Sequence, residues 1–296
     1  MTERSEARTG DFSADWLRLR EPADAHARAA DLVDLIRPGL ARPIVVRDLG
    51  CGTGSLGRWL APRLPGPQHW VLVDRDPALL DRAAATLPRY AADGAPVTVE
   101  ARLGDVTALS AADLTGTSLV TCSALLDLLT ADEVEAIAAA LAAGGTPALF
   151  TLSVSGEVRF DPPDPLDAVV AAAFDEHQRR TVTSAGQGSR TSGPGAGEAG
   201  SAAGGARRLL GTDAPVVTEQ VLTALGGRVT VRPSPWRLGP DRAQLAAAWL
   251  HGWLAAAVEQ QPELRVDAYR ERRLAGLAAG AVTVTVGHRD LLARFR

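Results

Sequence analysis

Short apolar runs alternate with longer helical stretches between residues 44 and 154 of this 296-residue chain. Five of these runs are too short for a typical helix and too apolar for a surface loop, so each predicts a buried strand. They are IVVRDL at 44–49, HWVLV at 69–73, VTVEARL at 97–103, SLVTC at 118–122 and PALFTLSV at 147–154. Strands that alternate with helices form a parallel sheet with helices on both of its faces. The sequence therefore predicts an α/β, doubly wound fold.

The helical patterns lie between these strands and continue into the second half of the chain. We predict helices at 23–38, 57–64, 77–87, 131–143, 215–225, 241–259 and 263–279. Two further strands are predicted at 228–232 and 281–286. Residues 181–206 are rich in Gly, Ser, Ala and Thr and cannot bury a core, so this segment predicts a flexible loop.

The composition excludes several classes of function. The formal net charge is −4 without an acidic or basic block, which disfavours nucleic acid as a partner. Lysine is absent, so neither a Schiff-base lysine nor a P-loop lysine is available. Cys51 and Cys122 lie far apart and the five histidines are scattered, so no metal site is expected. The polar N-terminus and the lack of a long apolar run predict a cytoplasmic protein without a membrane span.

The segment VRDLGCGTGSLG at 46–57 joins the first predicted strand to the next helix. Ligands of open parallel sheets bind beyond the carboxyl ends of the strands, where this loop lies. Gly52, Gly54 and Gly57 fit the dinucleotide fingerprint G-x-G-x-x-G. Sites for NAD and for S-adenosylmethionine both use such glycines, because they let the backbone approach the ligand closely. The glycine spacing alone therefore leaves both cofactors open.

Three aspartates at strand ends separate these two possibilities. Asp48 ends the first strand, where a carboxylate disfavours a pyrophosphate but favours the ammonium and sulfonium of S-adenosylmethionine. Asp74 follows the glycine loop by about 20 residues, a spacing typical of ribose binding, and Asp105 ends the third strand. An NAD site requires only one of these acids. A short-chain NAD-dependent oxidoreductase would also need a Tyr–Lys pair, which a chain without lysine lacks.

The segments VVRDLGCGTGSLG, VLVDRDPALL, ARLGDVTAL and LVTCSALLDLL make the chain similar to the class I S-adenosylmethionine-dependent methyltransferases. The resemblance covers about residues 44–154 and, more loosely, the final strand. It implies a mostly parallel, seven-stranded sheet with an antiparallel last strand. It also implies one domain over 1–296, with a cofactor-binding half at about 40–155, an acceptor-binding half at about 156–280 and a closing strand at about 281–287.

The resemblance assigns a set of residues to the cofactor S-adenosylmethionine. They are Asp48, Gly50, Cys51, Gly52, Asp74, Arg75, Asp105, Val106, Cys122 and Ser123. In the family, the backbone of residues 50–52 wraps the methionine part. Asp48 anchors this loop and, often through water, the amino group. Arg20 or Arg28, in the N-terminal segment, is a candidate to reach the methionine carboxylate.

The remaining cofactor residues follow the later strands. The resemblance implies that Asp74 binds the ribose, that Asp105 and Val106 contact adenine, and that Cys122 and Ser123 lie beside the transferable methyl group. Simpler interpretations stay open. Asp74 is also placed to cap the next helix, Asp105 to stabilise a turn, and Cys122 to pack in the core.

The expected reaction is transfer of a methyl group to a small-molecule acceptor, at oxygen, nitrogen or carbon. Asp127 in SALLDLLT and His177 in FDEHQRR are the candidate general bases. Asp127 is equally interpreted as a helix cap, and His177 as a surface histidine at a helix C-terminus. One alternative function is a methyltransferase-fold protein that binds the cofactor without methylating, and another is an NAD-dependent oxidoreductase. The acceptor and the oligomeric state stay open.

Overall fold

The computed structural model describes residues 13–183 and 206–295 of the chain. Its main sheet has the strand order β3-β2-β1-β4-β5-β10-β8, and β9 pairs with β10 beside this path. The strands are β1 (Ile44–Leu49), β2 (Gln68–Asp74), β3 (Val97–Leu103), β4 (Leu119–Ser123), β5 (Ala148–Asp161), β8 (Arg228–Pro233), β9 (Trp236–Leu238) and β10 (Thr283–Arg294). Strands β1 to β5 pair in parallel, and β10 is antiparallel to its three neighbours. The α/β prediction is confirmed, with eight strands rather than seven because the three-residue β9 is too short to show a pattern.

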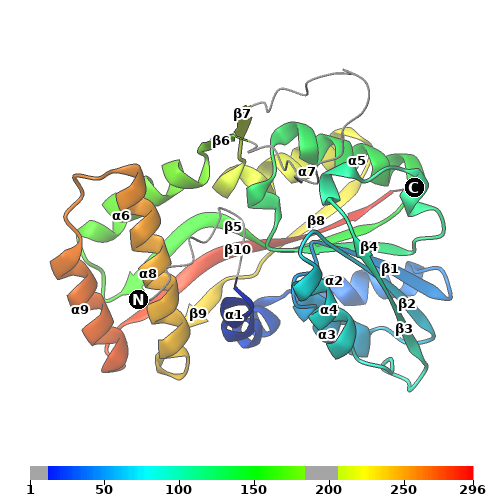
Figure 1. Ribbon diagram of the computed structural model, residues 1–296, viewed down its shortest axis with the longest axis horizontal. Coiled ribbons are helices and arrows are strands. Elements are labelled where there is room, and N and C mark those ends of the chain that lie inside the picture. The colour runs from blue at the N-terminus through cyan, green and yellow to red at the C-terminus, as the bar shows by residue number, and fades with distance from the viewer. Residues whose placement is uncertain (1–12, 184–205, 296) are drawn as a thin grey trace, which may run out of the picture.

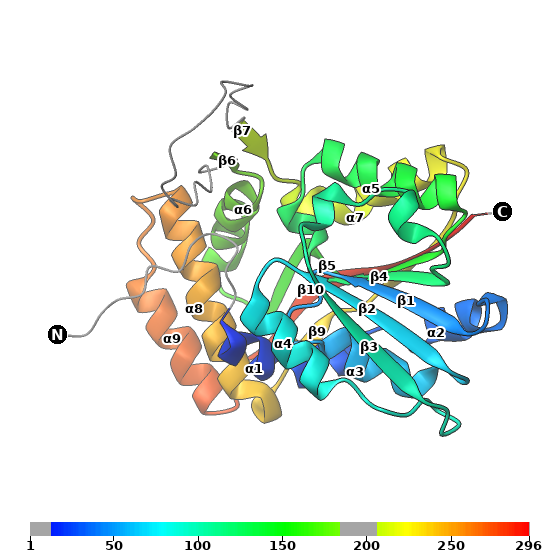
Figure 2. The ribbon, with the colours of Figure 1, turned by 45° about the vertical axis from the view of Figure 1, so that its right-hand side comes forward.

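Helices cover both faces of the parallel part of this sheet (Figures 1 and 2). One face carries α2 (Ala30–Ile36), α3 (Ser55–Leu60) and α4 (Pro77–Thr86), and the opposite face carries α5 (Ala131–Gly144) and α7 (Ala214–Ala224). Trp70 packs in the first cluster and its neighbour Val71 in the second, because alternate side chains of a strand point to opposite faces. Within the described residues, none of the helices has both the length and the apolar character needed to cross a membrane.

Strands β5 and β10 pair along most of their length and extend beyond the parallel strands (Figure 1). Around their far part pack α6 (Leu166–Gln178), α8 (Ala243–Gln260) and α9 (Asp267–Ala278), which form a third hydrophobic cluster. The sequence predicted ends at 154 for β5 and at about 287 for the closing strand, and both were too early. Gly156 interrupts the apolar pattern of β5, and the buried polar residues His288 and Asp290 interrupt that of β10.

The helix predicted over 23–38 is wrong, because the chain forms α1 (Ala14–Ala27) and then α2. Ser13 begins α1, since its hydroxyl accepts a hydrogen bond from the Trp16 amide at 3.2 Å. The helical conformation is interrupted at Arg28, with φ −54° and ψ 134°. The amide of Ala29 donates to the Asp290 carboxylate at 2.8 Å instead of to a helical carbonyl. This acceptor lies 261 residues further along the chain, so no local sequence pattern indicates that the helix is interrupted here.

The Gly-rich segment 181–206 begins and ends in a short antiparallel pair, β6 (Thr181–Thr183) and β7 (Ala206–Arg208). Arg207 of β7 makes two hydrogen bonds to the Glu133 carboxylate in α5, at 3.0 and 2.6 Å. The remaining residues of the predicted flexible loop, 184–205, lie outside the described residues. The ends of this segment are thus held against the helix that covers one face of the sheet.

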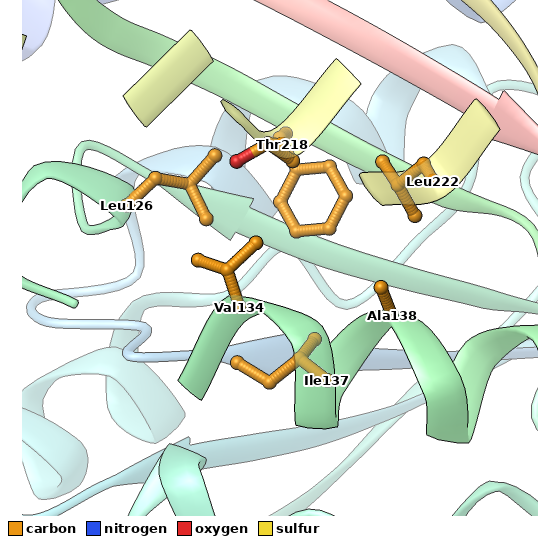
Figure 3. A pocket seen from close by; sticks show the side chains of 7 residues that line it. Leu126, Val134, Ile137, Ala138, Thr218 and Leu222 are labelled. Atoms are coloured by element: carbon orange, nitrogen blue, oxygen red, sulfur yellow. The ribbon is translucent and has the colours of Figure 1, made fainter. Parts of the chain in front are cut away.

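A small apolar cavity lies between α5, α7 and β5, on the face of the sheet away from α2 to α4 (Figure 3). The Thr218 side chain lines this cavity, and its buried hydroxyl has no hydrogen-bond partner within residues 13–183 and 206–295. Replacement by valine removes this hydroxyl at nearly constant shape. We expect Thr218→Val to raise the free energy of unfolding by about 1 kcal/mol, measured by urea denaturation. Thr212→Val is the matched control and lowers stability, because the Thr212 hydroxyl accepts from Arg179 at 3.1 Å. A loss of stability in Thr218→Val would contradict this account.

Candidate functional site

The glycine loop joins β1 to α3 at the carboxyl ends of the parallel strands. Gly50 and Gly52 have φ of +61° and +53°, a region that residues with a Cβ rarely adopt. A Cβ on Gly50 would lie 2.7 Å from Leu125 Cδ2, so the loop also closely approaches the segment after β4. The Cys51 amide donates to the Val73 carbonyl at 3.1 Å and thereby fixes the loop to β2. The loop therefore offers mainly backbone groups to a ligand.

Asp74 ends β2 and holds the glycine loop with its carboxylate. Its Oδ2 accepts from the Gly52 amide at 2.8 Å, and its Oδ1 from the Asp76 amide at 3.0 Å. The side chain that caps α4 is Asp76, which accepts from two helical amides. The interpretation of Asp74 as that cap is therefore wrong. Arg75 follows with an exposed side chain.

Asp48 is a carboxylate buried at the end of β1, with only 1% of its surface exposed. Thr121 Oγ1 donates to its Oδ1 at 2.7 Å, whereas Oδ2 has no hydrogen-bond partner in the part of the chain that the structure describes. Burial raises the pKa of this carboxyl to about 7, and the charge of Asp74 adds to the increase. The Thr121 hydrogen bond and the Arg28 charge act in the opposite direction. A cationic ligand group at this carboxylate would favour its charged form.

Arg28 is the buried cation of the same region, 4% exposed, between α1 and α2. Its Nη2 donates to Ser55 Oγ at 3.1 Å, at the start of α3, and to Ser123 Oγ at 3.2 Å, at the end of β4. Its Nε and Nη1 find no partner among the described residues. Burial lowers the pKa of Arg28, and the charges of nearby carboxylates raise it. A buried guanidinium with two unpaired nitrogens is suited to bind an anionic group.

Helix α1 lies across the glycine loop, between α3 and α8 (Figures 1 and 2). Glu21 of α1 forms a double hydrogen bond with Arg58 of α3, both at 2.7 Å. A Cβ on Gly52 would lie 3.4 Å from a methyl carbon of Leu17, so α1 contacts the loop itself. Arg20, the second candidate for a methionine carboxylate, is instead paired with Asp24 at 2.9 Å. Of the two arginines, Arg28 is the one that reaches the residues beside the loop.

The remaining candidate cofactor residues lie after β3 and at the end of β4. Asp105 is exposed, and its Oδ1 accepts from the Thr107 amide at 2.9 Å and from the Thr107 hydroxyl at 2.8 Å. This is the contact pattern of a turn residue. Val106 is half-buried. Cys122 is 3% exposed in a hydrophobic cluster, and burial raises the pKa of its thiol. Ser123 is half-buried and accepts the Arg28 hydrogen bond.

Asp127 lies in a short 3-10 helix, Leu126–Leu128, that follows β4. Burial raises the pKa of its half-buried carboxyl, while the charges of Arg20 and Arg180 act in the opposite direction. The cap of the following helix α5 is Thr130, which forms a capping box with Glu133. The interpretation of Asp127 as a helix cap is therefore wrong.

His177 lies in the last turn of α6 with 7% of its surface exposed, so the interpretation as a surface histidine is wrong. Its Nε2 lies 3.3 Å from Glu259 Oε2 of α8, and its Nδ1 lies 3.3 Å from Arg180 Nη1. Burial and the Arg180 charge lower its pKa, and Glu259 raises it. The structure thus gathers Asp48, Asp74 and Arg28 around the glycine loop, whereas His177 contacts α8.

Three residues that the sequence did not indicate complete the surroundings of the loop. Thr121 donates to Asp48, Ser55 accepts from Arg28, and Asp290 accepts from the amide that follows Arg28. Thr121 belongs to a strand and Asp290 to the last strand of the chain. No motif could have identified these two residues, because only tertiary packing brings them to the loop. Ser55 lies inside the glycine signature, between Gly54 and Gly57, and is the one of the three with a sequence signal.

Comparisons with known proteins address the same segment. Residues 46–145 match a family model described as a methyltransferase domain. No curated protein matches the sequence. Similar solved structures include a cyclopropane synthase from Mycobacterium tuberculosis, with 14% identity, 96% of this chain and 95% of that chain covered, and a TM-score of 0.46.

Two further similar structures are methyltransferases. Magnesium protoporphyrin IX methyltransferase from Synechocystis PCC 6803 has 14% identity, covers 97% of this chain and 90% of that chain, and has a TM-score of 0.43. Geranyl diphosphate C-methyltransferase from Streptomyces coelicolor A3(2) has 11% identity, 99% and 88% coverage, and a TM-score of 0.44. The family match spans β1 to the end of α5, and so contains the glycine loop and the ends of β2, β3 and β4.

Proposed function

We propose that this chain, a member of the methyltransferases with a Rossmann-like fold, transfers a methyl group from S-adenosylmethionine to a small-molecule acceptor. One observation carries the choice of cofactor. Two buried, oppositely charged side chains at the glycine loop have unpartnered polar atoms among the described residues: Asp48 Oδ2, and Arg28 Nε and Nη1. An amino-acid group carries one ammonium and one carboxylate, which matches this pair of charges. The residues present therefore fit the methionine end of the cofactor.

The other parts of the cofactor are assigned by position along the sheet edge. Asp74 keeps acceptor capacity for ribose hydroxyls, since each carboxylate oxygen accepts one amide in the structure and has a second lone pair. Asp105, Val106 and the exposed Arg75 follow the neighbouring strands and are proposed to contact the adenosine part. Cys122 and Ser123 end β4, next to β1, and are proposed to lie near the methyl group.

The bound cofactor supplies a methyl group already activated on a sulfonium. The task of this chain is then mainly to orient the acceptor, and positioning contributes roughly 7–11 kcal/mol to such reactions. A base is required only where the acceptor must lose a proton early. Asp127 is the better placed candidate, because it follows β4 and burial raises the pKa of its carboxyl. His177 is the second candidate, available in its neutral form because burial lowers its pKa.

The acceptor is proposed to bind against the far part of β5 and β10, where α6, α8 and α9 pack. A small molecule is favoured over a nucleic acid, because the chain has a net charge of −4 and no basic block. Two alternatives are retained for testing. The first is that the protein binds the cofactor without transferring the methyl group. The second is that the glycine loop binds NAD.

The deciding experiment is a calorimetric titration of the protein with S-adenosylmethionine, S-adenosylhomocysteine and NAD. We expect micromolar binding of the first two ligands and none of NAD. We expect Asp74→Ala to weaken this binding at least tenfold, because it removes the support of Gly52 together with the proposed ribose contact. Asp93→Ala is the matched control, since Asp93 accepts from two backbone amides in a surface loop elsewhere. Binding of NAD alone, or of no ligand, would overturn the proposal.

Methyl transfer itself is tested by release of S-adenosylhomocysteine in the presence of a panel of small-molecule acceptors. Turnover with one class of acceptor supports the enzyme, and Asp127→Asn then identifies the base by its pH–rate profile. Cofactor binding without turnover on any acceptor would favour the non-methylating alternative.

A further inference from the structure

Asp290 of β10 is a fully buried carboxylate outside the glycine loop. Its Oδ2 accepts from the Ala29 amide at 2.8 Å, and its Oδ1 accepts from the Leu152 amide at 2.8 Å and from Ser234 Oγ at 2.5 Å. These donors belong to the α1–α2 junction, to β5 and to the segment between β8 and β9. One side chain thus satisfies the buried amide of Leu152 and the half-buried amide of Ala29, and an unpaired amide is costly in a protein interior.

The contact with Leu152 coincides with a strained backbone. Leu152 has a φ of +57°, although it carries a side chain. The pairing of β10 with β5 shifts register between Arg289 and Leu291, which flank Asp290. Ala124, after β4, has a φ of +51°, and its amide donates to the Thr151 carbonyl at 2.9 Å. Such strain persists only where the surroundings determine the conformation, and it clusters at functional sites.

These contacts converge on Arg28 from two sides. Ala29, whose amide Asp290 holds, is the residue directly after Arg28. On the opposite side, Ser123 accepts from Arg28 at 3.2 Å and from the Thr151 hydroxyl at 3.0 Å. Thr151 in turn precedes Leu152, whose amide the same carboxylate holds. The backbone next to Arg28 and the strand that supports its hydrogen-bond acceptor are therefore fixed by one group.

We propose that Asp290 is a positioning residue that directs the Arg28 guanidinium at the carboxylate of the cofactor, by holding the amides of Ala29 and of Leu152 in β5. The proposal deepens the proposed function and rests on it, because its readout is cofactor affinity. Asp290 itself is not proposed to contact the ligand. Its negative charge also helps to retain the charge of Arg28, whose pKa burial lowers. The chemistry that Asp290 supports is recognition of an anionic amino-acid end.

The test compares the affinity for S-adenosylhomocysteine of the wild type, Asp290→Asn, Arg28→Met and the double variant. Asparagine keeps one acceptor oxygen but places an amide group where the second oxygen accepted, so at least one backbone contact is lost. We expect Asp290→Asn to weaken binding roughly tenfold. The double variant should bind no more weakly than Arg28→Met alone, because both changes remove the same interaction.

Asp167→Asn is the matched control for the loss of a structural carboxylate. Asp167 of α6 accepts from the Tyr269 hydroxyl at 2.6 Å and from Arg273 Nη2 at 2.6 and 2.7 Å, away from the loop. This variant should lose stability and keep its cofactor affinity. If Asp290→Asn does not fold, Ala29→Pro breaks the same contact from the donor side. The backbone there suits proline, with φ −73° at Ala29 and ψ 134° at Arg28.

The outcomes separate this inference from the proposed function. A wild type that binds no S-adenosylhomocysteine overturns the proposed function and this inference with it. A wild type that binds, beside an Asp290→Asn or Ala29→Pro variant of equal affinity, overturns the inference alone. Losses in affinity that multiply in the double variant would show that Asp290 acts independently of Arg28, and would also overturn it.

Discussion

Replacing Arg28 by methionine weakens the binding of S-adenosylhomocysteine by roughly ten- to a hundredfold, because a hydrogen bond to a charged group contributes about 1.5–3 kcal/mol. Methionine preserves much of the length of the side chain but removes the two nitrogens that lack partners in the described structure. The affinity is measured by calorimetry. The loss should be confined to ligands with a carboxylate, so 5′-methylthioadenosine, which has no amino-acid end, should bind equally to both proteins.

Arg63→Met is the matched control for this experiment. The Arg63 and Arg28 guanidinium carbons lie 4.6 and 5.7 Å from the centre of the same Trp59 ring. Arg63 is exposed, and its hydrogen bond goes to the Trp59 carbonyl. Its replacement should leave the binding of both ligands unchanged. A similar loss for 5′-methylthioadenosine and S-adenosylhomocysteine in Arg28→Met would contradict a contact with the carboxylate.

Asp48→Asn should make the unliganded protein more stable than the wild type at neutral pH, by an amount that increases with pH. The pKa of Asp48 is raised from 3.8 to about 7 in the folded protein. Between these values the folded state keeps a proton that the unfolded state releases, so stability falls as the pH rises through this window. The loss from this one group is on the order of 4 kcal/mol by pH 8. Asparagine does not titrate, so the variant does not lose this stability at high pH.

The measurement is the difference in unfolding free energy between Asp48→Asn and the wild type, at about pH 4 and about pH 8. Other carboxylates that titrate in both proteins cancel in this difference, which should grow toward high pH. A difference that is constant with pH would show that Asp48 is ionised throughout. The side chains that act on this titration come from three elements: Thr121 of β4, Arg28 before α2 and Asp74 of β2.

The same carboxyl makes the affinity for the cofactor depend on pH in the direction opposite to stability, so that affinity rises with pH. The ammonium of the ligand favours ionised Asp48, so binding below pH 7 must first displace a proton. The affinity of the wild type for S-adenosylhomocysteine should therefore fall roughly tenfold between about pH 8 and pH 6. Asp48→Asn should bind more weakly at pH 8 and show a much flatter profile. An equal slope in both proteins would assign the titration to another group.

The sequence predicted the parallel strands well, because local pattern and tertiary role agree in them. Strands β1 and β3 have the predicted bounds, and β2 and β4 differ from them by one residue at each end. The second halves of β5 and β10, after residues 154 and 287, were missed, and for β10 the physical reason is clear. His288 and Asp290 are buried polar residues with remote contacts: the His288 ring centre lies 5.0 Å from that of Trp236, and Asp290 accepts from the Ala29 amide. In the sequence they look like solvent-exposed loop residues.

The candidate site was predictable to the same extent. Asp48 and Asp74 were placed correctly at neighbouring strand ends, because parallel strands bring their carboxyl ends to one edge. The setting of Arg28 depends on Ser55, Ser123 and the amide contact after it, which join four separate segments. No spacing rule connects such segments. The sequence could therefore name Arg28 only as one of two arginines.

The extended pair of β5 and β10 has a consequence for how such a chain diversifies. Helix α6 directly follows β5, and α8 and α9 come just before β10. All three therefore pack against the far end of the β5–β10 pair. The glycine loop and Asp74 come earlier in the sequence, in a segment that ends before β5 begins. Under the proposed function, changes in these three helices alter the surroundings of the acceptor, while the glycine loop and Asp74 still hold the methyl donor. Asp290 and Leu152 mark the boundary that such changes must leave intact.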